Sequence, residues 1–184
     1  MRVFPTLAAL AGAVLLAHAA HASPNNGSSP DEFDKLLAER GLIQQISQVG
    51  QSAREKATDL VISAMGFLGV PYRRGGTSSD TGFDCSGFVR AMYQQTIGLI
   101  LPRSADQQAA ATQKIDQSEL KPGDVVFFNT LRRAFSHVGI YIGDNKFIHS
   151  PKPGAQVRVE DMRISYRRSR FDGARRVETD AAQP

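Results

Sequence analysis

Residues 82–98, GFDCSGFVRAMYQQTIG, decide the fold of this chain, because a glycine-rich loop gives way there to an amphipathic helix. The preceding residues, 73–82, contain Gly, Ser and Thr without hydrophobic periodicity, as loops do. From Ser86 onward, apolar side chains recur at helical spacing and predict one buried face. We expect this helix to end at Ile97, and Cys85 lies at the junction of loop and helix.

Helices are also expected on both sides of this element. A capping box at residues 52–55 predicts the start of a helix with an apolar stripe, and Gly69 and Pro71 are expected to end it. A second capping box at residues 104–107 predicts a shorter helix. Residues 31–51 carry a weaker pattern that is interrupted by two glycines, which favours one or two loosely docked helices.

The second half of the chain changes to the period of β-strands. The two central strands are joined by a turn at residues 143–145 and form a hairpin. Helices followed by antiparallel strands predict an α+β fold, with the N-terminal helices packed on an antiparallel β-sheet. The predicted strands are residues 125–128, 137–142, 146–149, 156–159 and 171–177.

The chain has 184 residues, and residues 1–22 contain a basic residue, an apolar run and a small-x-small pattern, which predict a secretory signal peptide. A retained membrane anchor is the alternative, but the apolar run is shorter than the ~20 residues that a membrane span needs. We expect residues 23–51 to be a flexible tether with the loosely docked helices, residues 52–177 to be one domain, and residues 178–184 to be a frayed tail. No cysteine lies near the cleavage site, so we expect no lipid anchor and an exported, periplasmic or secreted protein.

The net charge and the cysteine content limit the classes of partner and of chemistry that fit this chain. The formal net charge is +4 at pH 7, and the loss of Arg2 with the signal lowers it to +3. This sign favours anionic partners, and nucleic acid is a poor candidate for an exported chain. Exported proteins usually pair their cysteines in disulfides, whereas this chain has one cysteine, Cys85. Such a thiol is a reactive group, a buried filler or an intermolecular bridge.

Cys85 is the candidate nucleophile. A sulfur at a helix N-terminus lies near the positive end of the helix dipole and beside unpaired backbone amides, which lower a thiol pKa and stabilise an oxyanion. We therefore expect Cys85 to have a depressed pKa. A buried structural cysteine is the alternative, but the polar residues Asp84 and Ser86 flank this one.

A thiol nucleophile needs a base, and histidine suits that role near neutral pH. Two of the four histidines leave with the predicted signal, so His137 and His149 remain, both in the predicted hairpin. If residues 143–145 form a three-residue loop, His149 lies opposite Gly139 and the two imidazoles are neighbours on one face. A two-residue loop would place them on opposite faces.

We expect His137 to be the base and His149 to orient it, as in a catalytic triad. Hydrogen bonding of His149 to a nearby backbone carbonyl is the alternative. A zinc site made of Cys85, His137 and His149 is a further alternative. No close pair of ligands has metal-binding spacing, and we expect neither a metal nor another cofactor.

Six short segments in this order resemble the NlpC/P60 cysteine peptidases, and the likeness spans residues 52–177. The segments are PYRRGG (71–76), FDCSGFV (83–89), LPRS (101–104), PGDVVFF (122–128), SHVGIY (136–141) and FIH (147–149). The resemblance implies a papain-like α+β fold with Cys85 as nucleophile, His137 as base and His149 as the polar third member. It also implies that Tyr72 borders the active site and that Asp84 and Ser86 contact substrate.

The function implied by the resemblance is hydrolysis of amide bonds in peptidoglycan stem peptides. Family members cut γ-D-glutamyl-diaminopimelate bonds or the D,D cross-links, and this chain looks closest to murein endopeptidases. An acyltransferase or transpeptidase on the same fold is one alternative, because an amine can also resolve a thioester. A non-catalytic wall-binding module is another.

Overall fold

The computed structural model of this chain describes residue 35 and residues 41–130 and 132–178. The predicted signal peptide at residues 1–22, the first part of the tether and the tail beyond Glu178 lie outside these residues. None of the helices in the described part is long and apolar enough to cross a membrane.

The N-terminal helix differs from its prediction at one end. Helix α2 spans Leu42–Met65 without interruption, so the helix start predicted at Ser52 is wrong. Gly50 is tolerated inside it because glycine costs only about 1 kcal/mol in a helix interior. Ser52, predicted as a cap, lies exposed on the helix surface. The C-terminal end agrees better, since Gly69 follows the helix with a φ of +85°.

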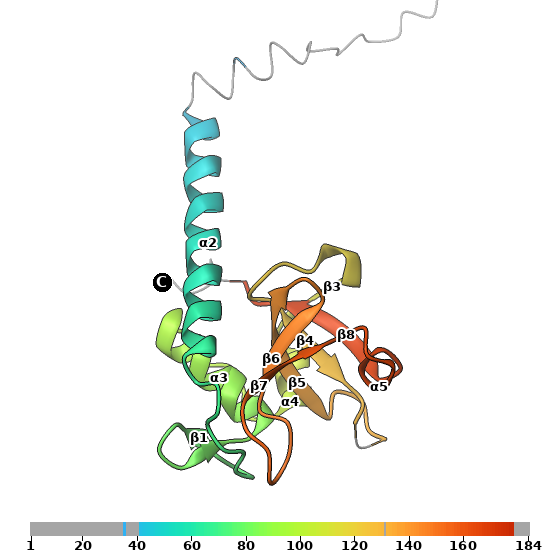
Figure 1. The fold of residues 1–184 in the computed structure, drawn as a ribbon. Coiled ribbons are helices and arrows are strands. Elements are labelled where there is room, and N and C mark those ends of the chain that lie inside the picture. Colours follow the sequence, from blue (N-terminus) through green and yellow to red (C-terminus); the bar gives the residue numbers. More distant parts are fainter. Residues whose placement is uncertain (1–34, 36–40, 131, 179–184) are drawn as a thin grey trace, which may run out of the picture. The chain divides into compact units, whose positions relative to one another are not determined.

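Three further helices and two sheets complete the described part (Figure 1). The helices are α3 (Cys85–Thr96), α4 (Ala105–Ala110) and α5 (Ser165–Arg168), with a 3-10 turn at Gln117–Glu119. The first strands, β1 (Thr77–Ser78) and β2 (Gly82–Phe83), form a small antiparallel pair. The others are β3 (Gln113–Ile115), β4 (Val125–Phe128), β5 (His137–Gly143), β6 (Lys146–His149), β7 (Arg158–Asp161) and β8 (Phe171–Arg176).

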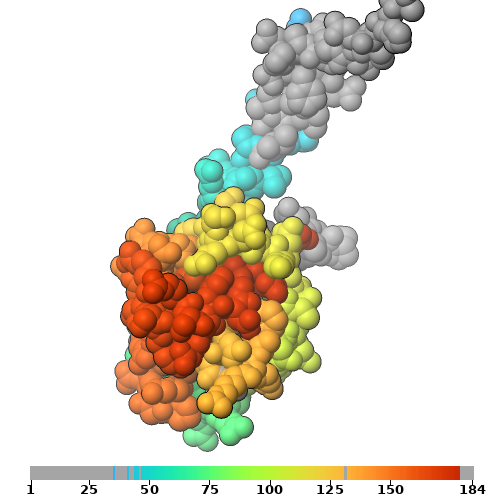
Figure 2. Space-filling view, turned by 90° about the vertical axis from the view of Figure 1, so that its right-hand side faces the viewer, coloured from blue at the N-terminus to red at the C-terminus, as the bar shows by residue number. Residues whose placement is uncertain are grey.

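The main sheet is antiparallel with the order β3-β8-β4-β5-β6-β7, which confirms the α+β prediction. In Figure 2 the yellow segment that contains β3 borders the red segment that contains β8. Sequence patterns missed β1, β2 and β3 because they have only two or three residues. They also placed β7 at residues 156–159, two residues before its observed position.

The two faces of the main sheet are both covered. On one face, residues of α2, α3 and α4 pack with Val125, Phe127, Val138 and Ile140 in the larger core cluster. On the other face a smaller cluster contains Val126, Phe128, Tyr141, Phe147 and Met162. Neighbouring residues of β4 and β5 therefore belong to opposite faces, as the period of a strand requires.

The hairpin of β5 and β6 fixes which residues face each other. Asp144 and Asn145 both have positive φ values, 50° and 57°, and form a two-residue turn in which Gly143 pairs with Lys146. The three-residue loop expected from sequence is therefore wrong. However, the register shifts between Gly143 and Tyr141, and Tyr141 pairs with Phe147. This irregularity restores the predicted alignment, so His149 still lies beside Gly139.

Candidate active site

Cys85 is the first residue of α3, and Asp84 caps this helix by accepting a hydrogen bond from the Gly87 amide at 2.7 Å. A Cβ atom at Gly87 would lie 2.1 Å from the Gly76 carbonyl oxygen, so only glycine lets the loop approach the helix this closely. The backbone amides of Ser86, Cys85 and Val138, the last at the start of β5, lie close enough to the sulfur to lower the pKa of the thiol. The thiol is thus held between the helix N-terminus and the strand that carries His137.

The thiol pKa runs opposite to the sequence-based expectation. Burial raises the pKa of Cys85, and the negative charge of Asp84 raises it further. The backbone amides of Ser86 and Val138 lower it but do not reverse the shift. The Asp84 carboxylate, which caps the helix beside the sulfur, opposes the effect of the helix terminus on the thiol pKa. At neutral pH the resting residue is therefore a thiol.

His137 and His149 form a buried pair with 4% and 0% of their surfaces exposed. His137 Nε2 lies 2.6 Å from His149 Nδ1, and the rings meet edge to face with centroids 4.8 Å apart. A Cβ atom at Gly139 would lie 3.1 Å from the Cβ of His149 and 2.7 Å from the Phe147 ring. The absence of a side chain at Gly139 therefore lets the two strands bring the rings together, as the sequence predicted.

Both imidazoles are neutral at neutral pH. Burial lowers the pKa of His137 well below its usual range, and the neighbouring His149 lowers it further. Burial also lowers the pKa of His149, to about 4, against the opposing effect of Glu160. The ring of His137 contacts that of His149 and lies beside the ring of Phe128.

Glu160 on β7 was missed by the sequence analysis. Its Oε1 atom lies 3.4 Å from His149 Nε2, and its Oε2 atom accepts a hydrogen bond from Arg167 Nε at 2.5 Å. Burial would raise the pKa of Glu160, but the contacts with His149 and Arg167 outweigh it and hold the pKa well below its usual range. The predicted strand at residues 156–159 stopped one residue short of Glu160, so no pattern linked it to the histidines.

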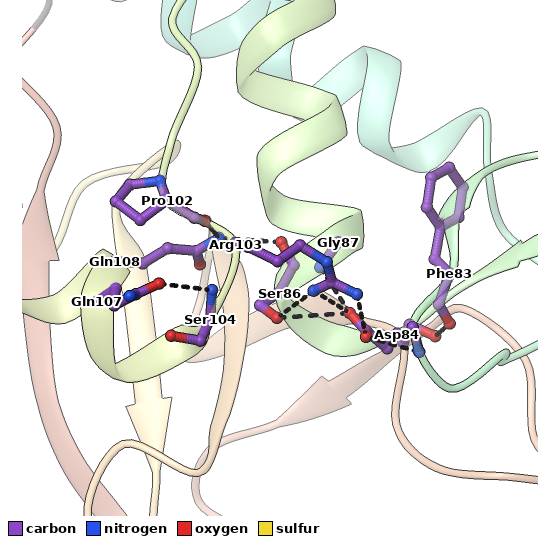
Figure 3. A network of polar contacts seen from close by, with 11 residues as sticks. Phe83, Asp84, Ser86, Gly87, Pro102, Arg103, Ser104, Gln107 and Gln108 are labelled. Carbon is purple, nitrogen blue, oxygen red and sulfur yellow. Dashed lines mark hydrogen bonds and ion pairs between the residues drawn. The ribbon is translucent and has the colours of Figure 1, made fainter.

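Asp84 and Ser86 belong to a polar network beside the thiol (Figure 3). Arg103 binds both carboxylate oxygens of Asp84, at 3.0 Å through Nη1 and 2.5 Å through Nη2, and also contacts Ser86 Oγ at 3.0 Å. The Gly75 amide donates to the second oxygen of Asp84 at 3.0 Å. These contacts fix the loop before Cys85, and the sequence analysis had assigned no role to Arg103.

The segment that carries Arg103 is tied to α3 by a buried glutamine. Gln108 Nε2 donates to the carbonyl oxygens of Ser86 and Pro102, both at 2.9 Å (Figure 3). The Ser104 amide bonds to Gln107 Oε1 at 3.4 Å, in line with the predicted capping box.

Tyr72 lies near both the thiol and the Asp84 carboxylate. Burial raises the pKa of its phenol, and the charges of Cys85 and Asp84 raise it further. Tyr72 forms a bridge with Phe83 and its amide bonds to the Ala155 carbonyl at 2.8 Å. The structure thus gathers Tyr72, Asp84 and Ser86 around Cys85. Within the described residues, no group of three or more His, Cys, Asp or Glu side chains is suited to hold a metal ion.

A family model described as the NlpC/P60 family matches residues 69–176. The chain is 41% identical over 129 residues to the murein DD-endopeptidase MepH of Escherichia coli K12, which covers 68% of this chain and 48% of that protein. It is 42% identical over 120 residues to a gamma-DL-glutamyl hydrolase of Bacillus subtilis 168, covering 65% of this chain and 29% of that protein. The chain therefore spans less than half the length of these two relatives.

Solved structures give the same picture of the fold. The NlpC/P60 domain of the peptidoglycan hydrolase SagA matches with a TM-score of 0.58 and 33% identity. The match covers 66% of this chain and 98% of that domain.

Proposed function

The chain belongs to the NlpC/P60 family, and from this premise we propose that it is a cysteine peptidase that hydrolyses amide bonds in peptidoglycan stem peptides or their cross-links. The names of MepH and SagA, a murein endopeptidase and a peptidoglycan hydrolase, support this substrate class. One observation carries the proposal. His137, which forms a buried pair with His149, is followed on β5 by Val138, and the backbone amide of Val138 acts on the thiol of Cys85 and lowers its pKa.

In the proposed acylation step, the thiol proton of Cys85 moves to His137 as the sulfur attacks the amide carbon. The raised pKa of Cys85 and the lowered pKa of His137 favour a neutral resting pair, so this transfer accompanies attack and does not precede it. Backbone amides at the start of α3 stabilise the oxyanion, since the first amides of a helix lack intrahelical acceptors.

The intermediate then collapses. His137 gives its proton to the leaving amine, the C–N bond breaks, and Cys85 keeps the acyl group as a thioester. A water molecule, deprotonated by His137, attacks the thioester and releases the acid and the thiol. His149 orients His137 throughout. Every proton in the cycle passes between these side chains, the peptide and water, so the proposal needs no cofactor.

Tyr72, Asp84 and Ser86 are the proposed substrate contacts. Arg103 already binds the Asp84 carboxylate and the Ser86 hydroxyl, so these two groups meet a substrate as part of a fixed network. The target within the stem is a γ-D-glutamyl-diaminopimelate bond or a D,D cross-link. The signal sequence expected at residues 1–22 supports a place of action outside the cytoplasm, in the periplasm or beyond the cell.

Digestion of purified peptidoglycan, followed by mass spectrometry of the released fragments, tests the proposal and identifies the bond. New free amino and carboxyl ends should appear with the wild-type protein and not with Cys85→Ala at matched concentration. A parallel digestion with an added amine separates hydrolysis from acyl transfer by product mass. Fragments identical to those from Cys85→Ala, although the wild-type protein binds peptidoglycan, would favour the wall-binding alternative.

A further inference from the structure

Glu160 is a half-buried carboxylate placed behind the histidine pair. Strand β7 pairs with β6 so that Glu160 lies opposite Phe147 and Arg158 lies opposite His149. The Glu160 side chain is 15% exposed, and its Oε1 atom lies 3.4 Å from Nε2 of the fully buried His149. This is a charge contact and not a well-aligned hydrogen bond, and among the described residues Nε2 has no hydrogen-bond partner. His149 Nδ1 already faces His137. Glu160, His149 and His137 thus form a row, with Glu160 at one end and His137 at the other.

Two arginines keep this carboxylate ionised. Arg167, whose side chain is 8% exposed, binds Oε2, and its guanidinium lies over the rings of Phe128 and Phe147 at 5.5 and 5.4 Å. Arg158, which is 48% exposed, binds Oε1 from the solvent side. An ionised carboxylate has no proton to give and can only accept hydrogen bonds. A carboxylate charge 3.4 Å from His149 Nε2 therefore favours a proton on that nitrogen over a bare lone pair.

The position of the proton on His149 in turn determines its position on His137. A neutral imidazole carries one proton, so when His149 holds it on Nε2, its Nδ1 can only accept. His137 Nε2, which lies 2.6 Å away, must then be the donor. A neutral His137 with its proton on Nε2 has an unprotonated Nδ1, and this is the nitrogen left for the thiol. The opposite tautomers would leave an N–H at that position, which cannot accept a proton.

We propose that Glu160 is a positioning residue that sets the tautomers of His149 and His137, so that His137 presents a basic Nδ1 to Cys85. The inference rests on the proposed function for its catalytic meaning, but the tautomers themselves are a property of the folded chain. Arg167 holds the carboxylate in place, and Glu160 acts on the reaction only through the two rings.

Glu160→Gln tests the proposal because it changes one hydrogen-bonding atom and keeps the shape. The buried Arg167 can only donate, so the amide oxygen of the new side chain should face Arg167, whereas the more exposed Arg158 can move away. The NH₂ group then points at His149 Nε2 and requires the other tautomer of both rings. Asp161→Asn is the matched control, since it removes the adjacent carboxylate of β7, whose partner is Arg163 and not a histidine.

The decisive measurement is long-range ¹H–¹⁵N NMR of the full chain labelled at histidine, which distinguishes protonated from unprotonated ring nitrogens. Signals of His18 and His21 are identified by replacing both with asparagine. We expect wild type and Asp161→Asn to carry the proton on Nε2 of His137 and His149, and Glu160→Gln to carry it on Nδ1 of both. Nδ1–H rings in the wild type, or unchanged rings in a folded Glu160→Gln, would overturn the proposal. If Glu160→Gln does not fold, the wild-type spectrum still decides it.

Kinetics supply a second readout. A wrong imidazole tautomer costs about 10⁴-fold in kcat in a serine protease triad, so we expect a fall of ~10²–10⁴-fold in kcat for Glu160→Gln with little change in KM. Glu160→Asp, which keeps the acceptor, should recover part of the loss. The NMR result does not depend on turnover. A wild-type protein with the expected tautomers but no hydrolysis would therefore contradict the proposed function alone, and an active protein with the other tautomers would contradict only the role of Glu160.

Discussion

Gly139→Ala should damage the site without touching a polar group. A Cβ atom at this position would lie 2.7 Å from Phe147 Cδ2 and 2.8 Å from the Ile148 carbonyl oxygen. Phe147 is fully buried and the carbonyl belongs to the backbone, so neither can move without opening the contact between β5 and β6. Overpacking of this kind costs about 1–3 kcal/mol. For a domain of this size, that loss should lower the melting temperature by about 2–12 °C.

The same displacement should separate His149 from His137, because the added Cβ would also lie 3.1 Å from the Cβ of His149. We therefore expect the rate of peptidoglycan hydrolysis to fall even at temperatures well below the melting temperature, where the destabilised protein is still folded. Gly50→Ala is the matched control: nothing lies within 4 Å of its Cβ position in helix α2, so it should stabilise by about 0.5–1 kcal/mol or leave melting unchanged. A Gly139→Ala protein that melts and hydrolyses like wild type would refute this account of how the strands approach each other.

Three further outcomes follow from the site. The rate of alkylation of Cys85 should rise with pH, and the midpoint of this rise should be higher in the folded protein than in the unfolded chain, because burial and Asp84 raise the thiol pKa. Asp84→Asn should lower the midpoint in the folded protein. A midpoint lower in the folded protein than in the unfolded chain would contradict the structure. His137→Gln should lose ~10²–10⁴-fold in kcat as expected for a general acid–base residue, and His149→Gln should lose less, whereas equal losses would mean that His149 does more than orient the base. The free energy of unfolding should fall by on the order of 3 kcal/mol as the pH falls from 6.5 to about 4, because His149 binds a proton in the unfolded chain and not in the folded protein. Denaturant titrations should show that the free energy of unfolding depends less on pH in His149→Gln.

The sequence anticipated those parts of the site that depend on local pattern. A loop that enters a helix placed Cys85 at the junction of the two, where it is the first helical residue. Strand alternation put His137 and His149 on one face, provided that the loop had three residues. The hairpin reached the right register for a reason that the sequence did not disclose, since a two-residue turn and an irregularity at Ile142 replaced the expected three-residue loop. The periodicity of a sequence indicates which residues share a face of a strand, but it does not reveal a register shift that compensates for a shorter turn.

Ion pairs between residues far apart in the sequence could not be predicted from sequence patterns. Arg103 meets Asp84 across 19 residues of sequence, and Arg167 meets Glu160 across seven residues that include a turn and a short helix. Nothing in the spacing of these charges distinguishes them from residues on a solvated surface. The thiol pKa was misjudged for a related reason: the helix terminus was visible in the sequence, but the depth of burial of the sulfur and the orientation of the Asp84 carboxylate were not.

The electrostatics of the proposed catalytic pair suit a chain with one cysteine. Asp84 and burial keep the Cys85 thiol protonated at rest, while burial of the histidines keeps His137 uncharged. Oxidants attack the thiolate far more readily than the thiol, so a protonated resting state protects a sulfur that has no disulfide partner. As a consequence, the thiolate must form while the sulfur attacks the substrate. In the proposed mechanism, a base with its free nitrogen toward the thiol and backbone amides that receive the oxyanion lower the barrier to that step only when a substrate carbonyl is present. The proposed mechanism thereby couples reactivity to the bound peptide, and it leaves the single thiol protonated when no peptide is bound.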